Sequence, residues 1–218
     1  MKSSIIFLMV LSSQGAIFCF AQKKISDFSI VYDYEIVTTK SAGSKPISGT
    51  NSLFVKGSLS RTEMGNQAYL SATIHDGTTG NTVILKEVSG QKILIRLTPQ
   101  EWKQINTGDD HVAFTNSTET KTIAGYKCIM AVAQAPDGSR LSVYYTNELS
   151  VDNPDYNPLF RNLGGLPLEY ELAKGDYTIR YTVLKLNLNP VPASKFDVPK
   201  TGFREMTFEE SKKLNSRL

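Results

Sequence analysis

The chain has few of the residues and motifs that carry enzyme or metal chemistry. Its two histidines, His75 and His111, lie in neither a His-x-x-x-His nor a His-x-x-Glu-His pattern, so the sequence does not support a zinc site. It has no Gly-x-Ser-x-Gly elbow of a hydrolase, and no Gly-x-Gly-x-x-Gly or phosphate-binding loop. We therefore expect no enzymatic activity, no cofactor and no metal.

Charge of one sign is also lacking. The 24 Lys and Arg barely outnumber the 21 Asp and Glu, and the surplus is not clustered, so nothing points to a nucleic-acid partner. A hydrophobic content of 40% with a net charge of +3 excludes a disordered chain. The 15 glycines and 9 prolines show no period, which excludes a collagen-like chain. The 218 residues suit one folded domain.

The hydrophobic run near the N-terminus is too short for a membrane span. Ile5–Leu11 is broken by Ser12–Gly15, whereas a spanning helix needs roughly 20 apolar residues. A basic start, this apolar run and the small residues before Gln22 are typical of a secretory signal peptide. We predict that residues 1–21 are cleaved. The protein is then exported to the periplasm or outer membrane, or out of the cell.

Cysteine is scarce: the chain has two, and the predicted cleavage would remove one of them. Cys19 would suggest a lipidated bacterial lipoprotein, but Phe18 stands where such proteins have a small residue. Cys128 is then the only cysteine of residues 22–218, which excludes an intramolecular disulfide. We expect Cys128 to be a small buried hydrophobe within a strand.

What the sequence does have is alternation of apolar and polar residues, which predicts β-strands. Short polar turns separate neighbouring runs at residues 89–90, 136–139 and 174–176, as is typical of antiparallel hairpins. Parallel neighbours would need helical crossovers, of which we see no sign. The alternating runs include FSIVYDYEI, YLSATI, ILIRL and LSVYYT.

Two helices are predicted from capping boxes. Thr98-Pro99-Gln100-Glu101 begins a short inserted helix with proline at its first position. Thr207-Phe208-Glu209-Glu210 begins a polar C-terminal helix. Residues 147–165 lack both periods, so we expect a long loop with one helical turn, of the kind that often forms a lid or binding segment.

The longest predicted strand indicates a curved sheet. Asp176–Leu188 would extend about 43 Å, while a compact chain of this size is only about 42 Å across. The apolar residues of this strand also change face after Val183. Either a bulge shifts the register near Val183-Leu184, or the two halves bury opposite faces. We predict a mainly β fold, a curved antiparallel sheet forming a half-open barrel with the inserted and C-terminal helices.

A family resemblance rests on residues 121–206. The stretches TIAGYKC, VYYTNEL, GGLPLEYEL and VPASKFDVPKTGFREM resemble an uncharacterised, mainly Bacteroidetes family of secreted domains. That family is thought to share the half-barrel of the lipoprotein-carrier (LolA-like) superfamily. The resemblance implies a single domain over residues 22–218, with a hydrophobic cavity on the concave side of the sheet and helical or loop lids. It implies no established activity.

Candidate ligand contacts are aromatic and aliphatic residues of the C-terminal strands. Tyrosine offers an apolar ring with a hydroxyl rim, which suits an amphiphile in a cavity, although these residue types are also ordinary strand cores. Trp102, on the inserted helix, either covers the cavity mouth or anchors that helix. The other candidates are Tyr145, Leu166, Leu168, Tyr170, Tyr177 and Tyr181.

These observations favour a non-enzymatic envelope protein that binds a hydrophobic ligand (a lipid, an acyl chain or a lipidated protein) in the concave face. The alternative is a structural or protein-interaction module whose concave face is filled by its own core. An open apolar groove of several hundred Å³ would favour the first, and a filled face the second. A hydrolase with an unrecognised site is the weakest hypothesis.

Overall fold

The structure is a computed structural model that describes residues 22–38, 45–66, 69–88, 90–135 and 137–215. The predicted signal peptide, with Cys19, lies outside the described residues. Within them, no helix has the length and hydrophobicity to cross a membrane. Cys128 is fully buried, as predicted, and this burial raises the pKa of its thiol to about 11.

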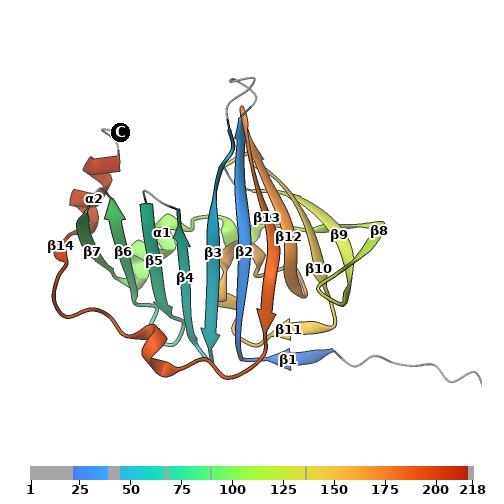
Figure 1. The fold of residues 1–218 in the computed structure, drawn as a ribbon, viewed down its shortest axis with the longest axis horizontal. Coiled ribbons are helices and arrows are strands. Elements are labelled where there is room, and N and C mark those ends of the chain that lie inside the picture. The colour runs from blue at the N-terminus through green and yellow to red at the C-terminus, as the bar shows by residue number, and fades with distance from the viewer. Residues whose placement is uncertain (1–21, 39–44, 67–68, 89, 136, 216–218) are drawn as a thin grey trace, which may run out of the picture.

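A curved sheet of twelve strands, not closed into a barrel, dominates the fold (Figure 1). Its spatial order is β14-β7-β6-β5-β4-β3-β2-β13-β12-β10-β9-β8. The predicted mainly β class and the three predicted hairpins are confirmed. The strands are β2 (Asp27–Thr38), β3 (Ile47–Lys56), β4 (Leu59–Gly65), β5 (Tyr69–Asp76), β6 (Thr82–Val88), β7 (Gln91–Leu97), β8 (Thr115–Ile123), β9 (Tyr126–Gln134), β10 (Arg140–Thr146), β12 (Leu166–Lys174), β13 (Tyr177–Asn187) and β14 (Arg204–Met206).

Two short parallel pairs depart from the predicted antiparallel pattern. β14 pairs with β7 at one edge of the sheet, and β1 (Lys23–Ile25) pairs with β11 (Leu149–Val151) in a separate two-stranded sheet. Both pairs join segments that are far apart in the sequence. They have no strand–helix–strand pattern from which parallel pairing could have been predicted. Each strand in them except β7 is only three residues long.

Both predicted helices are present, and both capping boxes are formed. In α1 (Pro99–Ile105) the Thr98 hydroxyl accepts from the Glu101 amide at 3.3 Å, and the Glu101 carboxylate accepts from the Thr98 amide at 2.8 Å. Thr207 and Glu210 make the equivalent pair at the start of α2 (Phe208–Asn215). Short 3-10 turns also occur: η1 (Asp109–His111), η2 (Pro154–Tyr156), η3 (Pro158–Phe160) and η4 (Ala193–Phe196).

A bulge on β13 resolves the change of face seen in the sequence. Val183 pairs with Tyr32 of β2 and Lys185 pairs with the adjacent Val31, so Leu184 is the extra residue. Leu184 is 62% exposed. Because the bulge restores the register, Leu186 pairs with Ile30 and faces the same core as Val183. The long strand therefore keeps one apolar face despite its broken alternation.

The sheet buries apolar side chains on both faces. Near β5–β7, the connector between β13 and β14 covers the convex face, where Val191 and Phe196 pack on Ile74 and Leu85. The helices lie on the other face, behind the sheet in Figure 1. There Met206 and Phe208 pack on Ile95 and Leu97, with Trp102 against the same cluster. The largest core lies on the concave side of β2, β13, β12 and β10.

The Leu184 bulge gives a prediction about register. Deleting Leu184 and Lys185 together should place Leu186 directly after Val183 and turn Leu186 and Leu188 away from the concave core, so we expect a loss of stability above about 4 kcal/mol or no cooperative folding. Deleting Leu184 alone would remove only the extra residue and keep both side chains on the core face. Leu184→Ser keeps the extra residue at an exposed position and should change stability by less than about 0.5 kcal/mol. Urea unfolding followed by circular dichroism measures both. A double-deletion variant as stable as the parent would contradict the register argument.

Candidate functional site

The concave face of the C-terminal half of the sheet is filled by the chain itself. Residues 147–165, predicted as a loop with one helical turn, form β11, η2 and η3. They insert the buried side chains of Tyr156, Phe160 and Leu163. The ring of Phe160 meets that of Tyr170 edge-on at 4.9 Å between centroids. This segment is therefore part of the core.

The predicted ligand contacts fall into three places. Tyr177 is 51% exposed, and Trp102 lines a pocket described below. The remaining five residues are buried together in the large concave core: Tyr145, Leu166, Leu168, Tyr170 and Tyr181. Tyr170 and Tyr181 stack with centroids 4.3 Å apart. That any of the seven contacts a ligand stays a prediction.

Two buried tyrosines of this core, Tyr32 and Tyr170, are held neutral. The Tyr32 hydroxyl donates to the Pro167 carbonyl at 2.8 Å, and the Tyr145 hydroxyl donates to Asn116 Oδ1 at 3.1 Å. Burial raises the pKa of Tyr32 and Tyr170 well above the ordinary tyrosine value. The rings of Tyr32 and Tyr170 therefore pack as apolar groups, and their raised pKa values do not suit them to act as acids or bases near pH 7.

An apolar groove remains open on the concave face of β6 and β7, between α1 and α2. Its volume is about 380 Å³. Ile105, at the end of α1, is 47% exposed there. Apolar side chains line the groove: Ile84, Ile95, Leu97, Ile105 and Phe208. Polar side chains complete it: Lys86, Gln104, Ser211 and Lys212.

The polar lining of this groove is cationic. Lys86 stands on β6 and forms no ion pair with any described residue. Lys212 lies over the Phe208 ring at 4.2 Å and pairs with Glu209 at 3.0 Å within the same helix. A groove with apolar walls and lysines suits a ligand that is apolar along its length and negative at one end.

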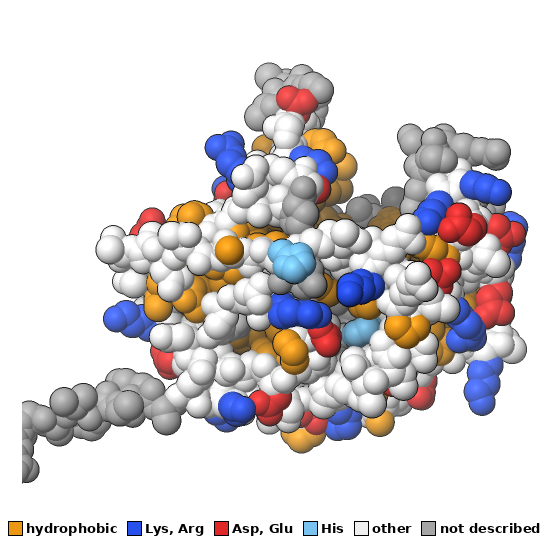
Figure 2. All heavy atoms as spheres, turned by 180° about the vertical axis from the view of Figure 1, so that it is seen from behind, with side chains coloured by type: hydrophobic (Ala, Val, Ile, Leu, Met, Phe, Trp, Pro, Cys, Tyr) orange, Lys and Arg blue, Asp and Glu red, His pale blue; other side chains and the backbone are white. Residues whose placement is uncertain are grey.

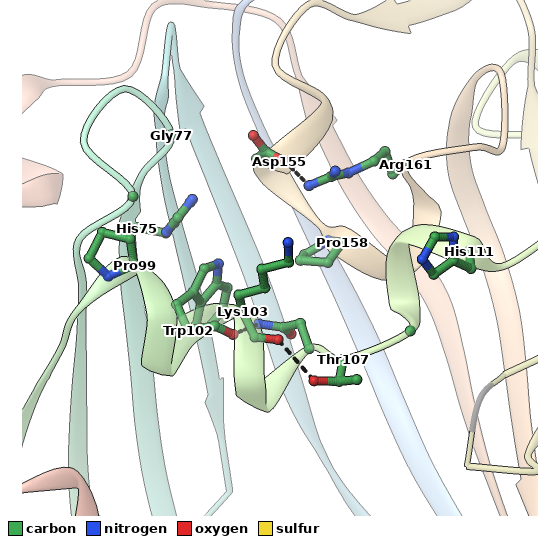
Figure 3. Close-up of a pocket in the computed structure, with 13 residues that line it drawn as sticks. His75, Gly77, Pro99, Trp102, Lys103, Thr107, His111, Asp155, Pro158 and Arg161 are labelled. Carbon is green, nitrogen blue, oxygen red and sulfur yellow. Dashed lines mark hydrogen bonds and ion pairs between the residues drawn. The ribbon is translucent and has the colours of Figure 1, made fainter.

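A second pocket, of about 460 Å³, lies on the other side of α1 (Figure 3). The turn between β5 and β6 contributes Gly77 and Gly80. The α1–η1 segment and the η2–η3 segment form the remaining walls, and we call this site the His75 pocket. Its side chains include Trp102, Lys103, His111, Asp155, Pro158 and Arg161.

His75 is the most enclosed polar residue of this pocket, with 4% exposure. Its Nδ1 lies 2.8 Å from Thr82 Oγ1, and its ring stacks on Trp102 at 5.1 Å between centroids. Burial lowers the pKa of His75 below its ordinary value, and the carboxylates of Asp155 and Asp76 only partly oppose this shift. The imidazole is therefore neutral near pH 7.

Positive charge in the His75 pocket comes from two side chains. Lys103 extends from α1 across the pocket toward Pro158 (Figure 3) and forms no ion pair with any described residue. Arg161 pairs with Asp155. Figure 2 shows both histidines, in pale blue, on the rear face of the molecule with Lys or Arg side chains beside them. No group of three or more His, Cys, Asp or Glu in the described residues is placed to hold a metal ion.

Sequence reasoning missed both open sites, apart from naming Trp102. In the sequence, His75 is a histidine outside any zinc-binding pattern, and no motif singles out Lys103. The one available signal was the alternation itself, which puts His75 on the face opposite to the buried Ile74. The residues that complete the pocket come from segments far apart in the sequence, and no local pattern links them.

Comparison with known proteins identifies the fold only. No protein-family model matches the chain, and no curated protein matches it. Two crystal forms of PNGF-II match with a TM-score of 0.51 and 12% identity over 86% of this chain. This chain spans only about a third of PNGF-II, 32% in one form. An uncharacterized conserved protein from Thermus thermophilus matches with a TM-score of 0.50 and 9% identity, over 84% of this chain and 90% of that one.

Structures of Pseudomonas aeruginosa MucB with MucA match more weakly, with a TM-score of 0.44 and 11% identity over 79% of this chain and 56% of that chain. A β-barrel-like protein of a domain of unknown function from Brucella abortus has a TM-score of 0.41 and 11% identity, over 76% of this chain and 99% of that one. The matches to PNGF-II and to the Thermus thermophilus protein show a shared fold alone, so the function must be argued from the side chains.

Because Phe160 is packed into the concave core of the C-terminal half of the sheet, removing its ring should cost much stability. Phe160→Ala should destabilise the protein by about 3–5 kcal/mol, because the 2% exposed ring leaves a cavity against Tyr170. Tyr177→Ala, at a half-exposed position, should cost less than about 1 kcal/mol. Chemical denaturation measures both. A small effect of Phe160→Ala would mean that this half is loosely filled and open to a ligand.

The neutral His75 predicts a fall in stability on mild acidification. The unfolded chain takes up a proton at about pH 6.5, but the folded chain does so only at lower pH, because the pKa of His75 is lowered by burial. The free energy of unfolding should therefore decrease from about pH 7 to about pH 5. His75→Gln should flatten this dependence, and His111→Gln serves as the matched control. Equal slopes in the parent and in His75→Gln would contradict the assignment.

Proposed function

We propose that this protein is an exported, non-enzymatic binding protein of the cell envelope. In this proposal it holds the apolar chain of an anionic amphiphile, a lipid or an acyl chain, in the groove between α1 and α2. The observation that carries the proposal is the open apolar groove on the concave face. The ligand site thus moves from the C-terminal strands, where we first expected it, to the N-terminal half of the sheet.

The apolar lining of the groove favours an apolar ligand. Ile95 and Leu97 are each 3% exposed and form a fixed apolar surface between the two helices. Ile105 is far more exposed than a core residue, so covering it with an apolar chain removes that surface from water at about 25 cal/mol per Å². The volume of about 380 Å³ is within the range of small-molecule sites.

Lys86 favours a ligand that carries an anionic group at one end. Its ammonium group has no carboxylate partner among the described residues, so an incoming anion does not have to displace one. Lys212 is already paired with Glu209 and contributes less. A carboxylate, phosphate or sulfate at the end of an alkyl chain satisfies this arrangement.

A second candidate function is a protein-interaction module with a self-filled core. The observation that favours it is the packing of Tyr156, Phe160 and Leu163 into the C-terminal half of the concave face, because these side chains occupy the space that a lipid would need there. In this case the protein contacts its partner through loops or the sheet edge. Crosslinking in the producing cell would then capture one stoichiometric protein.

The groove proposal is tested with dodecyl phosphate as the probe. Native mass spectrometry of residues 22–218 should show one bound molecule, and dodecanol should bind more weakly because it lacks the charge. Lys86→Gln should weaken dodecyl phosphate binding roughly fivefold, as expected for an exposed charge pair of about 1 kcal/mol. Ile105→Ser should weaken both probes.

Matched controls separate groove binding from general surface effects. Leu70 is 53% exposed on β5 and outside the groove, so Leu70→Ser should bind as the parent does. Lys185 is exposed on β13 and outside the groove, so Lys185→Gln should also be neutral. Binding that is unchanged by Lys86→Gln and Ile105→Ser would reject the groove and favour the interaction module.

A further inference from the structure

We infer that the His75 pocket is a second, separate binding site, and that it takes a small aromatic carboxylate. The site does not depend on the groove function, because α1 stands between the two cavities. Trp102, Lys103 and Asn106 face the His75 pocket, whereas Gln104 and Ile105 face the groove. Each cavity therefore has its own set of side chains and can be tested alone.

The first support is an imidazole nitrogen that has no partner among the described residues. Nδ1 of His75 is engaged with Thr82, and no described residue bonds to Nε2. Among the described residues, Tyr156 Oη is the only fully enclosed side-chain polar atom without a partner. Nε2 must therefore be reachable from the pocket. A ring that is 4% exposed but presents one free nitrogen to a cavity is a ready hydrogen-bonding point for a ligand.

The second support is the balance of charge around that nitrogen. Arg161 and Asp155 cancel each other as a pair, the His75 imidazole is uncharged near pH 7, and Lys103 adds one unpaired positive charge. Lys103, Arg161 and Asp155, which line the pocket, thus sum to one positive charge, while the Asp76 carboxylate, which also acts on His75, lies outside the lining. One net positive charge matches a monovalent carboxylate better than a divalent phosphate. Lys103 crosses the pocket toward Pro158 (Figure 3), so its ammonium group is placed over the cavity.

The third support is the set of apolar side chains beside these polar groups. Trp102, Pro99 and Pro158 line the same cavity, and the indole is already held in place by its stack on His75. An aromatic ring gains from packing against apolar side chains and from edge contacts with an indole. The volume of about 460 Å³ accommodates one small aromatic acid, with its carboxylate near Lys103 and its ring on the prolines and the indole.

The experiment uses Trp102 as the reporter, because it is the only tryptophan of the chain. Benzoate should change the Trp102 emission saturably in residues 22–218, whereas benzyl alcohol and inorganic phosphate should each fail to do so. Lys103→Gln should weaken benzoate binding roughly fivefold. Asp155→Asn, which frees Arg161 without changing shape, should strengthen it roughly fivefold.

Controls and contrary outcomes are defined by the same variants. Lys185→Gln and Ile105→Ser should leave benzoate binding unchanged, so failure of the groove proposal does not affect this one. No saturable response to benzoate would overturn the inference. Equal binding of benzyl alcohol would also overturn it, because the pocket would then be only apolar. So would equal binding of inorganic phosphate, since the pocket would then be a simple anion site. A loss of affinity in Asp155→Asn would contradict the charge argument.

Discussion

An open sheet of twelve strands has two apolar faces, and neither is stable in contact with water. A closed barrel would solve this by enclosing one face, but this sheet does not close. Segments outside the sheet must therefore pack on its two apolar faces and shield them from water. The longer segments between strands do this: residues 147–165 fill the C-terminal concave face, the β13–β14 connector covers the convex face, and the two helices cover β6 and β7.

The two open sites follow from how incomplete this cover is. The helix α1 has only seven residues, and it lies between the η2–η3 segment and α2. One short helix cannot fill the concave face from β5 to β7, so a cavity remains on each of its sides. The two cavities differ because α1 presents Trp102 and Lys103 to one side and Ile105 to the other. The chemistry of each site is thus set by the register of a single helical turn.

Local features of the fold were predictable from the sequence because their causes are local. The capping boxes at Thr98 and Thr207 depend on residues three positions apart, and the bulge near Leu184 on the alternation of its own strand. The cover of the sheet was not predictable in this way. Phe160 follows no period, and its burial depends on the tyrosines of the neighbouring strands. The His75 pocket could not be predicted from the sequence for the same reason, since His75 and Asp155 become neighbours only after the segment 147–165 has packed.

The order of the cover along the chain has a consequence for how the protein is made. Strands β3 to β7 form a local meander that is complete by Leu97, but both of its faces are finished by residues after Asn189: Val191 and Phe196 on one side, Met206 and Phe208 on the other. In a nascent chain, this meander therefore exposes two apolar faces to water until these late residues emerge. Folding is therefore completed by the C-terminal residues. A chain truncated before Val191 leaves both apolar faces of the β3–β7 meander uncovered and prone to aggregation.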